Sequence, residues 1–145
     1  FPTRRSADLN TRALAASPGD YRQQRERESV RDALAAFVGA DADDIAITAN
    51  TTEGMNLFAH GLDWQAGDEV IISTQEHPGG SGAYRTLEER RSIRIRWVEL
   101  PLQPADESEL LAAYAEVIGP RTRVIVVSHV SYVTGVKMPI AALAE

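Results

Sequence analysis

The chain has 145 residues, of which 43% are hydrophobic and 25% charged, and it carries a formal net charge of −6 at pH 7. This composition is typical of one soluble globular domain with a sizeable core. The acidic balance, without a basic tract, argues against binding to nucleic acid or to a membrane surface. No apolar run approaches the ~20 residues of a membrane span, and the absence of cysteine excludes disulfides and thiolate metal sites.

The two ends of the chain predict that it is part of a larger protein. It begins with Phe1 rather than Met, and residues 1–9 show neither signal-peptide order nor a helical period. We interpret them as a non-native or unstructured N-terminal segment. At the other end Pro139 suits the first turn of a helix, but only about one and a half turns follow it. We therefore expect residues 10–145 to be part of a larger domain.

Helices and short apolar strands alternate along the remaining sequence. In chain order we predict a helix over 20–38, a strand over 45–48, a helix over 51–62, a strand over 70–74, a helix over 80–91, a strand over 93–98, a helix over 106–118, a strand over 123–128 and a helix from Pro139. The strand over 93–98 alternates in polarity, so we expect only one of its faces to be covered. Such alternation is typical of an α/β fold, here a three-layer αβα arrangement with a mostly parallel sheet.

Polar residues collect where three of the four predicted strands end. Ligands of open α/β sheets bind beyond the carboxyl ends of the strands, so these segments are the candidate site. They are ANTTE (residues 49–53), QEHPGG (residues 75–80) and HVSYVTG (residues 129–135). The fourth segment, ELPLQPA (residues 99–105), lacks comparable chemistry.

The first segment has the features of an anion site at a helix start. Asn50 is a good N-cap, and the N–H groups of Thr51, Thr52 and Glu53 have no acceptor within the helix. Together with two hydroxyl groups and the positive end of the helix dipole, they predict a phosphate cradle. The competing interpretation is an ordinary capped helix.

The other two segments carry rings and hydroxyl groups. His77 precedes Pro78, which restricts it to extended geometry, and a fixed imidazole suits stacking on a planar ring or acid–base work. Ser131 and Tyr132 offer hydroxyl groups, and Gly135 permits a tight turn. The competing interpretation is that His77 is an ordinary surface histidine and that residues 129–135 are an ordinary polar loop.

Residues 21–145 resemble the large domain of class V aminotransferase-like enzymes. These are pyridoxal 5′-phosphate (PLP) enzymes of fold type I and include cysteine desulfurases, isopenicillin-N-epimerase-like proteins and kynureninases. The resemblance is carried by ITANTTEGMNLFAHGL, GDEVIISTQEHPGGSGAY and VIVVSHVSYVTG. It implies PLP as cofactor and a small-molecule substrate, either an amino acid or an amine. It also implies a homodimer in the cytoplasm.

The resemblance also implies roles for individual residues. In the family, the Thr-Thr-Glu turn binds the cofactor phosphate, which corresponds to Thr51 and Thr52. The histidine of the Glu-His-Pro segment stacks on the pyridine ring, which corresponds to His77. Tyr132 occupies the cofactor-binding position where desulfurases have an asparagine. We therefore favour an isopenicillin-N-epimerase-like enzyme over a cysteine desulfurase.

Two functional groups of the family have no counterpart in this sequence. The lysine that forms the Schiff base and the carboxylate near the pyridine nitrogen both lie further along the family's chain. Lys137, the only lysine here, matches neither position. We therefore expect no catalytic residue within these 145 residues and no activity of this chain alone.

Two other functions remain as alternatives: a nucleotide- or flavin-binding domain and a non-catalytic α/β domain. The sequence lacks both G-x-G-x-x-G and G-x-x-x-x-G-K-[ST], which weakens the first. It lacks the G-x-S-x-G elbow of hydrolases. His60, His77 and His129 do not have the spacing of metal ligands, so we predict no metal site.

Overall fold

The computed structural model describes the backbone of residues 21–145 and the side chains from residue 28 onwards. The prediction for residues 1–9 lies outside the described residues. The chain divides into two units, Phe1–Ala49 and Asn50–Glu145, and each is described by itself. Within the described part, no helix is both long and apolar enough to cross a membrane.

The described part of the first unit is helical. Helix α2 (Tyr21–Val38) confirms the first predicted helix, and Gly39 follows it with a positive φ of 72°, as is common after a helix end. A short 3-10 helix, η1 (Ala42–Asp44), comes next, and an ion pair of 3.8 Å joins Arg31 to Asp43.

The predicted strand over residues 45–48 was wrong. These residues form no regular element, and the sheet contains only strands from the second unit. Its prediction rested on the β-branched Ile45, Ile47 and Thr48. Such residues favour a strand only where the segment pairs with a neighbour and packs on it, because strand preference depends on that context.

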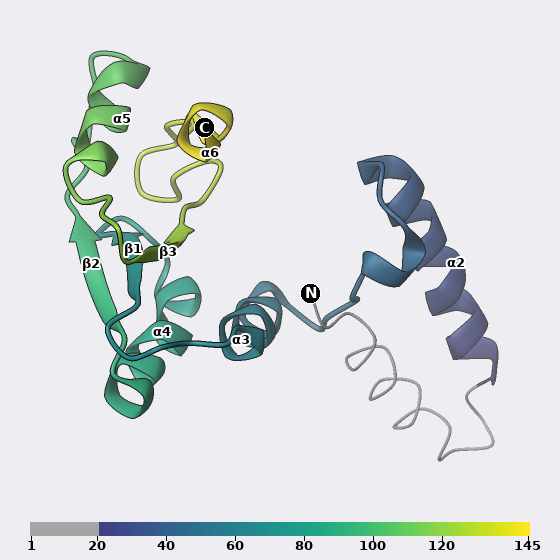
Figure 1. Ribbon diagram of the computed structural model, residues 1–145. Coiled ribbons are helices and arrows are strands. Elements are labelled where there is room, and N and C mark those ends of the chain that lie inside the picture. Colours follow the sequence, from purple (N-terminus) through teal and green to yellow (C-terminus); the bar gives the residue numbers. More distant parts are fainter. Residues whose placement is uncertain (1–20) are drawn as a thin grey trace. The chain divides into compact units, whose positions relative to one another are not determined.

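The second unit is the α/β domain that the sequence predicts (Figure 1). Its elements are α3 (Thr51–Gly61), β1 (Glu69–Ser73), α4 (Pro78–Arg91), β2 (Arg94–Val98), α5 (Glu107–Ala115), β3 (Thr122–Val126) and α6 (Ile140–Ala144). The three strands lie within two residues of the predicted ends, and all pairs are parallel in the order β2-β1-β3. Helix α4 begins at Pro78, before the predicted residue 80, and α5 ends at Ala115, before the predicted residue 118.

The central strand β1 supports two hydrophobic cores, one on each face of the sheet. Val70 and Ile72 point into a core with α3 and α4, which includes Tyr84. Ile71 points to the opposite face, into a core that includes Tyr114 of α5. Every residue of β1 is buried. The prediction of helices on both faces is therefore confirmed.

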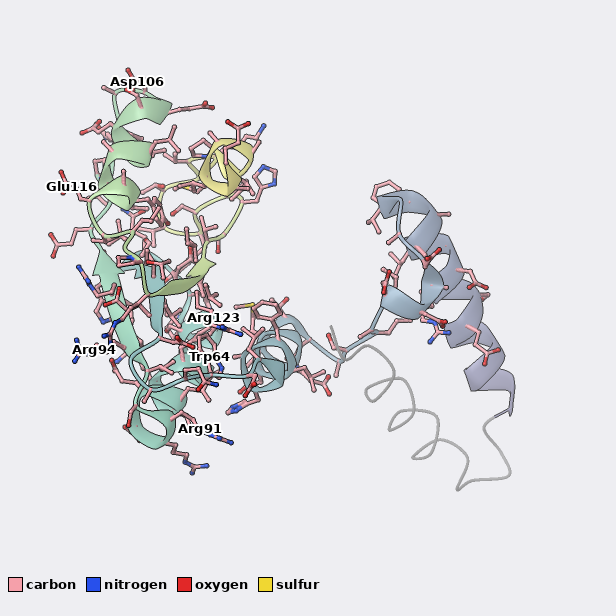
Figure 2. The ribbon with its side chains drawn as sticks, in the orientation of Figure 1. Trp64, Arg91, Arg94, Asp106, Glu116 and Arg123 are labelled. Atoms are coloured by element: carbon pink, nitrogen blue, oxygen red, sulfur yellow. The ribbon has the colours of Figure 1, made fainter. Side chains whose placement is uncertain are left out.

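Strand β2 lies at one edge of the sheet and is mostly exposed. Ile95 packs against one core and Val98 belongs to the other, so the prediction that only one face is covered was wrong. Trp97 keeps 39% of its surface exposed, and the guanidinium carbon of Arg85 lies 5.0 Å from the centre of its ring. Figure 2 shows Arg91, the last residue of α4, and Arg94, the first residue of β2, projecting outward, and Asp106 and Glu116 at the two ends of α5.

The order of the strands places a topological switch between β1 and β3. The chain passes from β1 to β2 through α4, then returns past β1 to β3 through α5. Right-handed crossovers in opposite directions put these two helices on opposite faces of the sheet. The loops that leave β1 and β3 therefore diverge, and a crevice forms beyond their carboxyl ends.

Candidate functional site

A cavity of about 720 Å³ lies at this switch point, which is within the range of small-molecule and cofactor sites. Its lining brings together all four residues that the sequence singles out for the cofactor: Thr51, Thr52, His77 and Tyr132. The wall between them comes from the end of β3 and from apolar side chains of α3 and α4, among them Met55, Phe58 and Tyr84.

The start of α3 forms one end of the cavity. Asn50 caps the helix, because its Oδ1 accepts the N–H of Glu53 at 2.9 Å. This N–H is therefore used internally, and the predicted cradle is reduced from three backbone donors to those of Thr51 and Thr52, which have no acceptor within the helix. The side-chain amide of Asn56 donates to the carbonyl of Thr52 at 2.8 Å and braces the first turn.

The start of α4 positions the imidazole of His77. This residue is the N-cap, with the extended geometry that Pro78 imposes (φ −62°, ψ 136°). Its Nδ1 accepts the N–H of Gly79 at 3.0 Å. Because an N–H group can only donate, Nδ1 carries no proton in this arrangement, and the neutral ring is protonated on Nε2. The ring is thus fixed in both orientation and tautomer.

The two helix starts meet at Gly79. A Cβ atom at this position would lie 2.7 Å from Oγ1 of Thr52 and 3.1 Å from Nδ1 of His77. Glycine, which has no Cβ, therefore leaves a small space at this position, with the Thr52 hydroxyl group on one side of it and the His77 imidazole on the other. A donor group for an anion and a flat ring are therefore adjacent in the same cavity.

The loop after β3 brings Tyr132 to the imidazole. The ring centres of His77 and Tyr132 are 5.3 Å apart, and their planes are inclined by 72°, an edge-to-face contact. The loop is closed by hydrogen bonds from the Gly135 N–H to the Ser131 carbonyl at 2.8 Å and from the Ser131 N–H to the Val136 carbonyl at 2.9 Å. Gly135 has a φ of 72°, which explains why glycine stands there.

Sequence reasoning assigned no role to Glu76 and Tyr84, which both line the cavity. Glu76 joins the loop after β1 to Ser128, a contact between residues 52 positions apart. Tyr84 lies on the buried side of α4, where burial raises its pKa to about 12. The helical spacing of Tyr84 with Leu87 could have placed it in the core, but a single sequence gives no signal for the Glu76–Ser128 pair.

Other polar residues of the sequence lie outside this site. His60, His129 and Lys137 are not in the cavity lining; Lys137 is exposed and pairs with Val130 in an antiparallel bridge. Among the described residues there is no group of three or more side chains of His, Cys, Asp or Glu that could hold a metal ion.

Comparison with known proteins identifies the family. The sequence matches aminotransferase class V over residues 15–145. The chain belongs to this family. Its membership confirms the resemblance inferred from the three strand exits and disfavours a nucleotide- or flavin-binding domain.

Several class V relatives have assigned activities. The isopenicillin N epimerase of Streptomyces clavuligerus is 34% identical over 136 residues, which are 91% of this chain and 34% of that protein. A probable cysteine desulfurase of Pseudomonas putida is 38% identical over 122 residues, which are 80% of this chain and 29% of that protein. The chain therefore spans about a third of the length of these relatives.

Solved structures agree with the fold. The complex of the cystine C-S lyase C-DES with its product cysteine persulfide superimposes with a TM-score of 0.78 and 31% identity, over 88% of this chain and 34% of that chain. A C-DES mutant with glycine covalently linked to the PLP cofactor gives the same TM-score at 28% identity, over 98% of this chain and 37% of that chain.

Proposed function

We propose that this chain, over residues 10–145, is the cofactor-binding part of a PLP-dependent enzyme that acts on an amino acid or an amine. The observation that carries the proposal is the cavity at the switch point between β1 and β3. It combines an anion site at a helix start with a fixed imidazole, which is what a phosphorylated planar ring requires. Membership in aminotransferase class V supports the same conclusion.

In this proposal each wall of the cavity has one task. The backbone N–H groups of Thr51 and Thr52, with the Thr52 hydroxyl group, bind the phosphate at the positive end of α3. The imidazole of His77 covers one face of the cofactor ring and excludes water from it. The Gly79 N–H holds its Nδ1, which leaves Nε2 for the ring proton. When bound, PLP supplies an electron-withdrawing ring that stabilises negative charge on the substrate.

We further propose an isopenicillin-N-epimerase-like reaction rather than cysteine desulfuration. Tyr132 supports this choice, because its ring packs on His77 at the position where desulfurases have an asparagine. With tyrosine at this position, there is no side-chain amide to contact the cofactor. The complete enzyme is proposed to be a cytoplasmic homodimer, and its covalent lysine to lie outside these 145 residues.

The test uses the complete protein. It should bind PLP with a visible absorbance band, and borohydride reduction followed by peptide mapping should label a lysine outside residues 1–145. A Lys137→Arg variant should be labelled to the same extent, because Lys137 is outside the cavity lining. Stoichiometric labelling of Lys137 instead would overturn the proposal that the covalent lysine lies outside these 145 residues, and amino-acid turnover by the 145-residue chain by itself would overturn its expected inactivity.

The reaction class has a separate test. Single enantiomers of amino acids incubated with the enzyme in deuterated water should exchange the α-proton and lose optical activity. Cysteine should release no sulfide. Rapid sulfide release from cysteine, without racemisation of other amino acids, would reverse the preference for an epimerase while leaving the PLP assignment intact.

A further inference from the structure

Glu76 connects the loops that leave the two strands at the cavity. Its Oε1 accepts the backbone N–H of Ser128 at 2.7 Å, and its Oε2 accepts the Ser128 hydroxyl group at 2.7 Å. Both oxygens of the carboxylate are thus used by one residue. Short, charge-assisted hydrogen bonds of this kind are among the stronger ones in proteins.

Gln75, the residue before Glu76, extends this connection to the loop after β2. The side-chain amide of Gln75 donates to the carbonyl of Leu100, beyond β2, at 2.8 Å. Its Oε1 accepts the hydroxyl group of Ser131 at 3.2 Å. Two consecutive residues after β1 therefore hold the loops after both neighbouring strands, and Ser131 is itself buried.

Along the chain, these contacts lie close to both residues of the ring pair. His77 directly follows Glu76, and Tyr132 lies four residues after Ser128. Since the rings of Tyr132 and His77 make an edge-to-face contact with their centres 5.3 Å apart, the relative position of the two loops sets the relative position of the two rings. A loop displaced at Ser128 would move Tyr132 and open that wall of the cavity.

We propose that Glu76 is a positioning residue: through its two hydrogen bonds to Ser128, it holds Tyr132 against His77 and so shapes the wall of the cofactor cavity. The role toward PLP rests on the proposed function, whereas the loop contact does not.

Glu76 is half-buried, and both of its oxygens accept hydrogen bonds from Ser128. The pKa of Tyr114 is raised to about 12, first by burial and second by the charge of Glu76.

The first measurement is made without cofactor. In the complete protein, Glu76→Ala should speed amide exchange at Ser128 by roughly tenfold or more, since a hydrogen bond to a charged group is lost. It should also remove the nuclear Overhauser effect between the His77 and Tyr132 rings. Glu76→Gln, which keeps one acceptor, should give a smaller change, and Ser128→Ala should weaken the ring contact while keeping the backbone bond.

Glu88→Ala is the matched control. Glu88 also accepts a backbone N–H, that of Ile95 at 2.8 Å, but at the start of β2 and outside the cavity lining. This variant should speed exchange at Ile95 and leave Ser128 and the ring contact unchanged. If Glu76 only stabilised the fold, Glu76→Ala and Glu88→Ala would lower the thermal unfolding temperature to a similar extent, and neither would change the contact between the two rings.

The second measurement uses the protein loaded with PLP. Glu76→Ala should alter the visible circular dichroism of the bound cofactor and weaken PLP binding by roughly tenfold, whereas Glu88→Ala should do neither. If Glu76→Ala does not fold, Ser128→Ala carries the same test.

The outcomes separate the two proposals. Unchanged Ser128 exchange and an unchanged ring contact in Glu76→Ala would overturn the positioning role, whether or not PLP binds. If those signals respond but the wild-type protein takes up no PLP, the loop contact is supported and the proposed function fails.

Discussion

The two ends of the sheet are built from the same three strands and use opposite chemistry. At the amino end, charged side chains pair with one another: Arg96 with Glu69 at 3.3 Å and Arg123 with Asp68 at 3.8 Å. At the carboxyl end, most polar groups are neutral, and the helix starts of α3 and α4 face a cavity. Charges that pair with each other need no ligand, whereas helix starts offer donors to one.

The connections at the two ends explain this difference. The turns into the strands are tied directly by backbone bonds, such as the Gly67 N–H to the Ser92 carbonyl at 2.9 Å and the Glu69 N–H to the Arg121 carbonyl at 2.8 Å. The loops out of β1 and β3 are joined by side chains, above all Glu76 and Ser128. The amino end therefore stabilises the sheet, and the carboxyl end arranges the site.

The largest loss of stability is expected at Ile71, because the whole sheet, and so both of its ends, depends on the central strand β1. Ile71, in the middle of β1, is completely buried. Ile71→Ala should lower the free energy of unfolding by about 2–5 kcal/mol through lost burial and a cavity. Urea unfolding of the complete protein measures it, with Ile118→Ala, at a site that is 47% exposed, as the milder control. Equal effects of the two variants would contradict the central role of β1.

Thr52→Val tests the carboxyl end alone. The variant keeps the shape of the side chain but removes the hydroxyl group beside Gly79. Its PLP affinity should fall by about 1.5–3 kcal/mol, the range for a hydrogen bond to a charged group, with thermal unfolding of the cofactor-free protein little changed. Thr86→Val is the control, since Thr86 lies on α4 outside the cavity lining. An unchanged PLP affinity would remove Thr52 from the phosphate site.

His77 should contribute less than Thr52, because a ring contact is weaker than a bond to an anion. Loss of stacking in His77→Ala should cost about 0.5–1.5 kcal/mol of PLP affinity and shift the absorbance of the bound cofactor. His77→Phe should retain more of the affinity, although it loses the Nδ1 contact with Gly79. Wild-type binding and spectra in both variants would leave His77 as a loop residue only.

The sequence predicted those parts that depend on local pattern. The apolar runs of β1 and β3 marked the sheet, and the end of β1 marked His77, since parallel strands end at one edge. Thr52 was marked by the capped start of α3, because the strand predicted before it is absent. Residues 45–48 had the same local pattern as a strand, yet strand formation depends on a neighbour that the pattern does not contain. The order β2-β1-β3 and the Glu76–Ser128 pair are also long-range properties.

The number of free backbone N–H groups at the start of α3 also could not be predicted from the local sequence pattern. Asn50 was recognised as a cap, but a cap consumes the donor that it satisfies, and here that donor is the N–H of Glu53. A cap and an anion site therefore compete for the same first turn. Only the geometry tells which N–H groups remain for a ligand.

The smallest effect is expected at the amino end, for the ion pair of Arg123 with Asp68. The side chain of Arg123 is 44% exposed and its Nε lies 3.8 Å from the carboxylate, so water screens most of the attraction. Arg123→Gln should lower the free energy of unfolding by only about 0.2–1 kcal/mol, and the difference should shrink at high salt. Asp68 remains satisfied, because it also accepts the N–H of Gln65 at 2.8 Å.

The same variant decides whether the two ends are independent. If the amino end only stabilises the sheet, PLP titration of Arg123→Gln should give the wild-type affinity at every salt concentration, while its unfolding midpoint moves slightly. A loss of PLP affinity as large as that of Thr52→Val would mean that charge pairing at the start of β3 is transmitted along the strand to Ser128. The separation of the two ends would then be wrong, since β3 is the element that they share.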